Sequence, residues 1–309
     1  MASVTEAAAP TSGAPDAPVW VRKKKPTFTP RRVILHTFLT IIALAWVFPI
    51  AWAILNSFRD YAYTSVNGYV SLGGWTIKNY QNAWAQGDFT KHFLNSFYIT
   101  VPAVVLTLFL SSCVAFVLAR FSFKFNLAML GLFTAANLLP QQSLLIPLYR
   151  LFRSIPLPTW MSDSGTMLDS YWALILVNTA FQTGFCTFVL SNYMKTLPRE
   201  LYEAAEVDGA SVWRQYWQIT MPLCRPPMAA LATLEITWIY NEFFWATVLL
   251  QSGDKFPVTS SLNNLRGEFF TNLNLVAAGS VIVAIPTLVI FFLLQKQFVS
   301  GLTLGANKG

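Results

Sequence analysis

Apolar residues run for about 20 positions at a time in six windows of the chain, and each window can cross a hydrocarbon layer of roughly 30 Å as a helix. The windows are residues 33–55, 95–119, 127–149, 171–191, 228–250 and 275–295. None of them shows the alternating pattern of a membrane β-barrel strand. The pattern therefore predicts an all-α, polytopic membrane protein with six transmembrane helices.

Several prolines fall inside these windows. Neighbouring helices in a bundle can satisfy the carbonyl groups that an intramembrane proline releases. We therefore expect kinks and not breaks at Pro49, Pro102, Pro140, Pro147 and Pro286.

The composition agrees with a membrane protein, because 54% of the residues are hydrophobic and only 11% are charged, against about a quarter charged in soluble proteins. Cys113 and Cys186 lie in apolar runs and Cys224 lies beside a proline pair. These positions have no zinc or redox spacing, so we interpret the cysteines as small hydrophobic side chains and expect no metal site.

The basic residues predict the orientation, since short cytoplasmic segments carry an excess of Lys and Arg. With the N-terminus inside, two-thirds of the 21 Lys and Arg residues fall on inner segments. Both termini are therefore expected in the cytoplasm. Residues 1–32 are expected to form a disordered basic tail, whose cluster beside the first span favours anionic lipid over nucleic acid as its partner. Residues 33–298 are expected to form the six-span domain, and residues 299–309 are expected to form a cytoplasmic tail.

Several kinds of active site are missing from the sequence. No Gly-x-x-x-x-Gly-Lys phosphate loop occurs, so any ATP-driven step requires a partner. His36 and His92 lie at the edges of different spans on opposite sides of the membrane. No Gly-x-Ser-x-Gly nucleophile turn is present. These absences disfavour an intramembrane enzyme, although a mechanism based on carboxylates remains open.

The longest inner loop, residues 192–227, predicts two short helices joined by a sharp corner. Thr196 can cap the first helix and Pro198 fits its first turn. Gly209 can end it, because glycine tolerates left-handed geometry. Acidic residues in the first turns suit the positive end of the helix dipole. We call this predicted feature the elbow.

The second helix of the elbow is expected over residues 212–220. Ser211 can cap it and Pro222 is expected to stop it. The elbow could be only a solvated linker. However, Ala204, Ala205 and Ala210 are small enough to let the surface of a partner approach the backbone.

The same loop resembles a known motif. Glu203-Ala204-Ala205 is followed, at fixed spacing, by Gly209, Ile219 and Met221-Pro222. This run resembles the EAA motif in the permease subunits of bacterial binding-protein-dependent ABC importers, with Met221 in place of the usual leucine. The resemblance implies an ABC importer type I permease fold and a role in ATPase coupling for the residues that carry the motif, which are Glu203, Ala204, Ala205, Asp208, Gly209, Ile219 and Pro222.

Other stretches resemble the second permease of the maltose type. They are residues 139–149, 240–244 and 301–305. The likeness covers the chain from about residue 33 onward and implies a permease for a carbohydrate, with an oligosaccharide as the expected cargo, in the bacterial plasma membrane.

The resemblance also implies partners. These are a second permease that forms a heterodimer with this chain, two ATPase subunits and an extracytoplasmic sugar-binding protein. ATP and Mg are expected on the ATPases, with no cofactor bound by this chain. Glu203 would face a basic residue of an ATPase, and Gly209 would form the corner of the docked elbow.

The fifth window carries two acidic and two indole side chains. On one straight helix of about 3.6 residues per turn, Glu235, Trp238, Glu242 and Trp245 fall on one face. Carboxylates and indoles suit sugar recognition, and intramembrane acids are functional candidates. Alternatively, Glu242 lies near the outer interface and Glu235 bonds a neighbouring span. Further pathway candidates that can equally serve as contacts between helices are Asn137, Gln141, Gln142, Asn178, Gln182 and Asn241.

The outer loop between the fifth and sixth windows is poor in charge. In the family, the corresponding loop reaches into the binding protein. The resemblance therefore implies contacts for Gly267, Phe269 and Asn272, although such a loop can equally pack on its own bundle.

Two other functions are considered. A phosphate-bearing solute such as glycerol phosphate would favour basic groups in the pathway, but no window has Arg or Lys in its middle. An ion-coupled secondary carrier is disfavoured by the elbow and by the lack of a visible inverted repeat.

Overall fold

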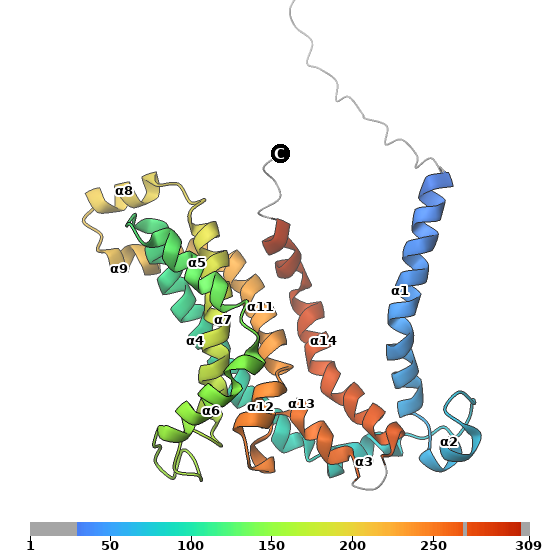
Figure 1. The fold of residues 1–309 in the computed structure, drawn as a ribbon. Coiled ribbons are helices and arrows are strands. Elements are labelled where there is room, and N and C mark those ends of the chain that lie inside the picture. Colours follow the sequence, from blue (N-terminus) through green and yellow to red (C-terminus); the bar gives the residue numbers. More distant parts are fainter. Residues whose placement is uncertain (1–29, 268–270, 304–309) are drawn as a thin grey trace, which may run out of the picture. The chain divides into compact units, whose positions relative to one another are not determined.

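The computed structural model describes residues 30–267 and 271–303, and Figure 1 shows their arrangement. Regular structure in these residues is helical apart from two isolated bridges, Arg59 with Trp75 and Pro156 with Thr166. The elements are α1 (Pro30–Ser57), α2 (Tyr61–Asn67), α3 (Lys78–Gln86), α4 (Phe89–Arg120), α5 (Asn126–Ala136), η1 (Gln141–Leu144), α6 (Leu145–Ser154), α7 (Tyr171–Met194), α8 (Glu200–Val207), α9 (Val212–Gln215), η2 (Tyr216–Thr220), α10 (Met221–Leu223), α11 (Arg225–Tyr240), α12 (Phe244–Leu249), η3 (Gly253–Lys255), α13 (Val258–Ser261), η4 (Leu262–Leu265) and α14 (Leu273–Thr303).

The chain divides into two compact units, residues 1–50 and 51–309. Most of α1 belongs to the first unit. This part is apolar around its whole circumference, and its large hydrophobic side chains are exposed. A helix of this kind is suited to a hydrocarbon environment.

Within the part of the chain that the structure describes, four helices are long and apolar enough to cross a membrane, namely α1, α4, α7 and α14. α1, α4 and α14 continue without a break through Pro49, Pro102 and Pro286, as expected. α1 begins at Pro30, a few residues before the first apolar window.

The third window is a broken span, and the expectation of a kink at Pro140 is wrong. α5 ends at Ala136, and the chain turns by 94° before η1 and α6. Pro140 itself is extended, with φ −65° and ψ 125°. Proline also disfavours helical geometry in the residue before it, so the helix stops at this point. Pro147 lies in the first turn of α6, where its missing amide costs little.

The fifth window is also broken, so the expectation of one straight helix is wrong there too. α11 ends at Tyr240 and α12 begins at Phe244. The structure therefore shows four apolar helices of full length, or five spans if α5 and α6 count as one, and not six continuous helices.

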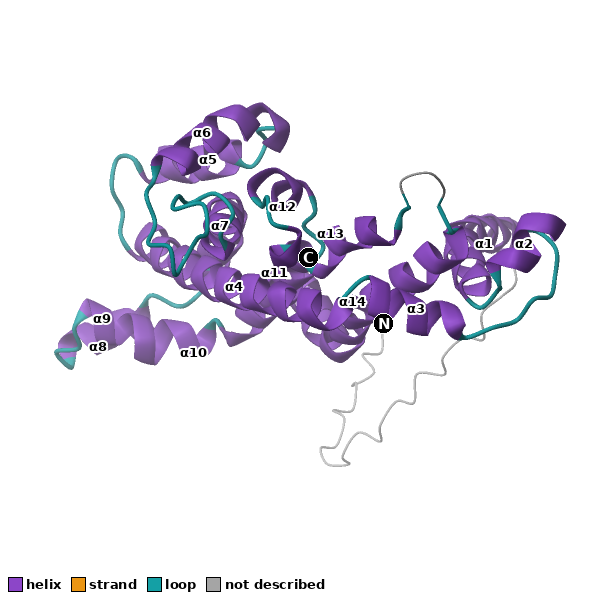
Figure 2. Cartoon of the chain, turned by 90° about the horizontal axis from the view of Figure 1, so that it is seen from below, coloured by secondary structure: helices purple, strands orange, loops and turns teal. Residues whose placement is uncertain are grey.

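The core of the second unit lies between α4, α7 and α11, which run side by side in Figures 1 and 2. Small residues on these helices, among them Ala103, Ala115 and Gly184, are buried where the backbones approach. A Cβ atom added to Gly184 would lie 2.5 Å from the carbonyl oxygen of Phe133 on α5. Small residues of this kind permit close packing between helices in a membrane.

The loop after α1 is built around the fully buried Arg59. The guanidinium donates to the carbonyl oxygens of Gly73 (3.1 Å) and Tyr69 (2.7 Å) and to the hydroxyl of Ser71 (2.7 Å). No carboxylate within the described ranges forms an ion pair with it. These hydrogen bonds to neutral acceptors fix the path of the loop.

Candidate functional site

The predicted elbow is present, and it lies at one end of the bundle formed by α4, α7 and α11 (Figure 1). We call this end the elbow end and the opposite end, where α12 and α13 lie, the far end. Gly209 forms the corner with φ 72°, and a Cβ atom there would meet nothing within 4 Å. The glycine is therefore needed for its left-handed backbone and not for space, which confirms the predicted corner.

The caps of the elbow differ in part from the expectation. Ser211 accepts a hydrogen bond from the amide of Arg214 at 3.3 Å and caps α9, as predicted. The expectation that Thr196 caps the first helix is wrong. Its hydroxyl donates to the carbonyl oxygen of Tyr193 at 2.7 Å and therefore belongs to the end of α7. α8 begins only at Glu200.

The second helix of the elbow does not stop at Pro222. It continues through the π-helical turn η2 into α10 and ends at Leu223. The amide of Met221 donates to the carbonyl oxygen of Tyr216, five residues earlier. This wider turn lets the helix pass Pro222, which has no amide hydrogen to donate.

Buried hydroxyl groups fasten the elbow to the bundle. The Tyr216 hydroxyl lies 2.7 Å from the hydroxyl of Ser112 on α4. Within the elbow, the Tyr202 hydroxyl lies 3.0 Å from the Thr220 hydroxyl. Burial raises the pKa of Tyr202, so its side chain stays neutral. The first bond joins the second half of the elbow to α4 and the second bond joins the two halves of the elbow, so the elbow is a rigid attachment.

An ion pair adds a second attachment that the sequence did not reveal. Arg120, the last residue of α4, pairs with Glu206 of α8, and its guanidinium lies 5.1 Å from the ring centre of Tyr202. Glu203 borders a cavity of about 400 Å³ at the same place, between the ends of α4, α7 and α8. The sequence separation of 86 residues between Arg120 and Glu206 explains why no local pattern could predict this contact.

The coupling candidates divide into exposed and buried residues. Glu203, Ala204, Asp208, Gly209 and Pro222 are exposed, Ile219 is half-buried, and Ala205 is buried in the core of the chain. Two apolar side chains that the sequence analysis did not select share the exposed surface of α8. Leu201 is 42% exposed and Val207 is 88% exposed. Exposed aliphatic residues on a helix that is otherwise acidic would have been a usable signal for a docking surface.

The pathway candidates of the fifth window do not share one face, because the break between α11 and α12 separates them. Glu235 and Trp245 are buried, whereas Trp238 is 43% exposed. Trp245 stacks on Phe181 of α7 at a centroid distance of 5.7 Å. Trp238 packs against Phe185 of α7. The one-face prediction is therefore wrong.

Both intramembrane acids bond to neighbouring groups. The Cys186 thiol on α7 donates to Glu235 Oε1 at 3.1 Å, while Oε2 is buried without a hydrogen-bond partner within the described residues. Glu242 accepts from the backbone amides of Trp245 (2.7 Å) and Ala246 (3.1 Å). Glu242 therefore caps the N-terminal end of α12, which begins at Phe244, and stabilises the break between α11 and α12.

The remaining pathway candidates lie on several elements. Asn178 is buried and donates to the carbonyl oxygen of Leu174 at 2.8 Å. Gln142 and Asn241 are exposed, and Gln141 and Gln182 are half-buried. Asn137 lines an apolar cavity of about 460 Å³ between the α5–α6 pair and α7.

Three residues of the loop at the far end are predicted to contact the binding protein, and two of them lie within the described residues. Gly267 is exposed. Asn272 accepts from the amide of Leu275 at 3.0 Å and caps α14. Phe269 lies outside the described residues, as do residues 304–309 of the predicted tail.

Comparison with known proteins identifies the family. Residues 111–303 match the family described as "Binding-protein-dependent transport system inner membrane component". The chain belongs to this family. It is an integral membrane permease, and as such it is a transport component and not an enzyme.

The relatives of this permease share most of its length. It is 31% identical to a probable ABC transporter permease of Pyrococcus horikoshii, which covers 84% of this chain and 92% of the relative. It is also 31% identical to the arabinooligosaccharides transport system permease AraQ of Halalkalibacterium halodurans, over 93% of this chain and 99% of AraQ. The melibiose, raffinose and stachyose import permease MelC of Bacillus subtilis is again 31% identical, over 76% of this chain and 82% of MelC.

A solved structure has the same fold. It belongs to a bacterial ABC transporter involved in the import of the acidic polysaccharide alginate, and it superposes with a TM-score of 0.73 at 22% identity. The match covers 89% of this chain and all of the other. The described helices therefore form an ABC importer permease fold, with α5–α6 and α11–α12 as its broken elements.

Proposed function

We propose that this chain is the transmembrane permease subunit of an ATP-driven importer of oligosaccharides. Relatives named for arabinooligosaccharides and for melibiose, raffinose and stachyose support this substrate class. The middle of each apolar window lacks Lys and Arg, which suits a neutral solute. Calorimetry of the cognate binding protein against a panel of sugars tests the substrate class, and binding of only phosphorylated or amino-acid ligands would contradict it.

In the proposed topology the elbow lies in the cytoplasm and both termini lie on the same side. The distribution of basic residues supports this orientation in a bacterial plasma membrane. The α5–α6 and α11–α12 pairs each act as one broken crossing, which gives six crossings in total. Labelling of a cysteine introduced at Asp208, which is exposed at the elbow, tests the orientation.

The proposed partners are a second permease, two ATPase subunits that carry ATP and Mg, and an extracytoplasmic sugar-binding protein. The basic N-terminal tail faces anionic lipid. We assign no nucleic-acid partner and no cofactor to this chain.

Docking of an ATPase on the elbow rests on one observation. The rigid elbow exposes acidic Glu203 and apolar Val207, which lie one turn apart on the same face of α8, and it also exposes Leu201. A basic residue in an ATPase cleft would pair with Glu203, while the apolar side chains would be buried. ATP-driven closure would then move α8, and α7 and α11 with it.

Reconstitution of the full complex in proteoliposomes tests this docking. Removing one partner of a buried ion pair costs roughly 3 to 5 kcal/mol, so Glu203→Ala is expected to abolish most sugar-stimulated ATP hydrolysis. Val207→Asp should weaken co-purification of the ATPase, and Gly209→Val should distort the corner. Lys124→Ala, an exposed charge outside the elbow, is the control. Wild-type stimulation and uptake in all three elbow variants would remove the elbow from the mechanism.

We propose that the exposed polar and aromatic pathway candidates contact the sugar transiently during transport. These are Gln142, Trp238 and Asn241. Glu235 and Trp245 are buried within the chain and support the helices instead.

A further inference from the structure

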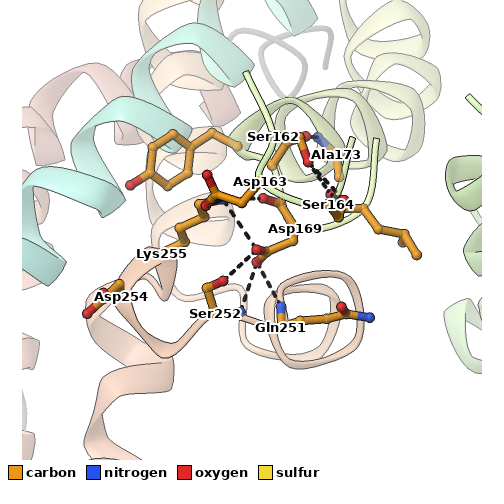
Figure 3. Close-up of polar contacts among 12 residues, drawn as sticks. Ser162, Asp163, Ser164, Asp169, Ala173, Gln251, Ser252, Asp254 and Lys255 are labelled. Atoms are coloured by element: carbon orange, nitrogen blue, oxygen red, sulfur yellow. Dashed lines mark hydrogen bonds and ion pairs between the residues drawn. The ribbon is translucent and has the colours of Figure 1, made fainter. Parts of the chain in front are cut away.

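The two helices that carry the elbow meet again at the far end. α7 enters the elbow and α11 leaves it, and α11 continues into α12. The residue two positions before α7 is Asp169, and the chain beyond α12 begins a segment that we call the outer segment, residues 251–258. Figure 3 shows Asp169 directed at Gln251 and Ser252 of this segment.

Asp169 is almost fully buried and bonds to the outer segment through both carboxylate oxygens. Oδ1 accepts from the backbone amides of Gln251 and Ser252, each at 2.9 Å. Oδ2 accepts from the Ser252 hydroxyl at 2.5 Å. The amide of Asp169 donates in turn to the carbonyl oxygen of Leu249 in α12 at 2.9 Å. Asp169 also has a left-handed backbone with φ 55°, a conformation that an aspartate tolerates better than most residues.

Lys255 completes the arrangement from within the outer segment. Its ammonium group lies 2.8 Å from the carbonyl oxygen of Asp169 and 3.3 Å from Oδ2. It also pairs with the exposed Asp163 at 2.7 Å. The lysine side chain is largely covered, so these charge-assisted bonds are screened less than surface pairs. Figure 3 shows Lys255 between the two aspartates.

The outer segment is fastened to α4 as well. His92 Nδ1 lies 2.7 Å from the carbonyl oxygen of Phe256. The Asn95 amide group donates to the carbonyl oxygens of Asp254 (2.8 Å) and Phe256 (3.0 Å). The segment is thus held by α4 on one side and by Asp169, two positions before α7, on the other.

We propose that Asp169, Ser252 and Lys255 form a clamp that makes α7 and the outer segment move together, so that motion of the elbow reaches the extracytoplasmic surface of the permease. Asp169 and Lys255 are positioning residues in this proposal. Within the bundle, the Cys186–Glu235 bond joins α7 to α11. The clamp joins the chain before α7 to the chain after α12 at the far end. It rests on the proposed function of the elbow and adds the route by which ATPase closure reaches the binding protein.

Energetic considerations single out Asp169 within the clamp. A carboxylate that accepts two backbone amides and a hydroxyl group cannot leave without exposing buried donors. Burial alone would raise the pKa of Asp169, but the hydrogen bonds from Ser252, Gln251 and Lys255 lower it below the usual value. The carboxylate is therefore charged at neutral pH and can hold the hydrogen bonds and the ion pair of the clamp.

The clamp is tested in the full importer with three readouts, namely co-purification of the ATPase, basal ATP hydrolysis and hydrolysis stimulated by the sugar-loaded binding protein. Asp169→Asn and Lys255→Met are expected to keep the first two and to lower the stimulation about fivefold or more. Asp88→Asn is the matched control, because Asp88 is also an aspartate with positive φ but is exposed. It should retain wild-type stimulation.

An engineered disulfide between positions 169 and 252 should restore the coupling that loss of the clamp removes. In the double variant Asp169→Cys/Ser252→Cys, oxidation is expected to recover most of the stimulation and reduction is expected to abolish it. A merely structural role would not respond to the redox state in this way. Wild-type stimulation in Asp169→Asn, or no recovery in the oxidised variant, would overturn the proposal. If the unmodified complex shows no stimulation, or Glu203→Ala leaves it intact, the proposed function fails first.

Discussion

The Cys186 thiol donates to Glu235 Oε1 over 3.1 Å and joins α7 to α11 at a place where both side chains are fully buried. No Lys or Arg in the described residues pairs with this carboxyl group. A buried polar group needs its hydrogen bond, and an unpaired buried charge is costlier still.

Replacement of Glu235 by a neutral amide should therefore be tolerated. Glu235→Gln keeps the acceptor oxygen and the volume, whereas Glu235→Ala removes the acceptor and leaves a cavity, which is expected to cost about 2 to 5 kcal/mol. Thermal unfolding of the purified complex in detergent measures the difference. Equal melting temperatures for the two variants would contradict the role assigned to this bond.

Gly184 should be intolerant of even the smallest side chain. A Cβ atom there would lie 2.5 Å from the Phe133 carbonyl oxygen, which belongs to the backbone of α5 and cannot move freely. We expect Gly184→Ala to destabilise the protein by about 1 to 3 kcal/mol through overpacking. Gly131→Ala is the control, because a Cβ atom there meets nothing within 4 Å and alanine favours a helix. Comparable unfolding temperatures would show that α5 and α7 can separate at no cost.

The Asp169 clamp should weaken only in acid. Because its folded pKa is lowered, Asp169 contributes its full stabilisation above the unfolded pKa of about 3.9 and loses it as the pH falls through the folded value. The difference in melting temperature between the wild type and Asp169→Asn should be constant from neutral pH to about pH 5 and should shrink below about pH 4. Among the described residues, the charged group that contacts the Asp169 carboxylate is Lys255, which also pairs with Asp163. A difference that grows in acid would contradict the sign.

The Arg120–Glu206 pair should matter little for stability. Glu206 is 58% exposed, and exposed pairs contribute about 0 to 1 kcal/mol. Glu206→Gln is therefore expected to shift unfolding slightly at low salt and not at high salt. Arg120→Met should cost more, because the guanidinium also covers the ring of Tyr202. A double-mutant cycle would separate the two effects.

The sequence was sufficient where the determining interaction is local. The corner at Gly209 and the cap at Ser211 follow from residues within a few positions of each feature. The family resemblance carried by the elbow was likewise readable from spacing in the sequence.

The break after α11 could not be predicted in this way. No proline or glycine lies between Tyr240 and Phe244. The helix ends because the Asn241 side chain bonds back to the Thr237 carbonyl oxygen and the Glu242 carboxylate binds the amides of the next helix. On a straight helix the Glu242 carboxylate would belong to one continuous polar face, but as a cap on α12 it lies at the break instead.

The contacts that organise the far end were hidden for a different reason. Asp169 and Ser252 are separated by 83 residues, and Arg120 and Glu206 by 86. These pairs come together because α4, α7 and α11 pack against one another. The order of charged residues along the sequence does not indicate which distant residues will meet.

The interrupted elements have a consequence for how the nascent chain enters the bilayer. α11 has 16 residues, so it is about 24 Å long and falls short of a hydrocarbon layer of roughly 30 Å. α5, with 11 residues, is shorter still. Neither can be stably inserted as an isolated segment, since free backbone groups at the breaks would meet lipid. During biogenesis α11 can dock on α4 and α7, which are synthesised before it, whereas α5 has to wait for α7, the later helix on which it packs.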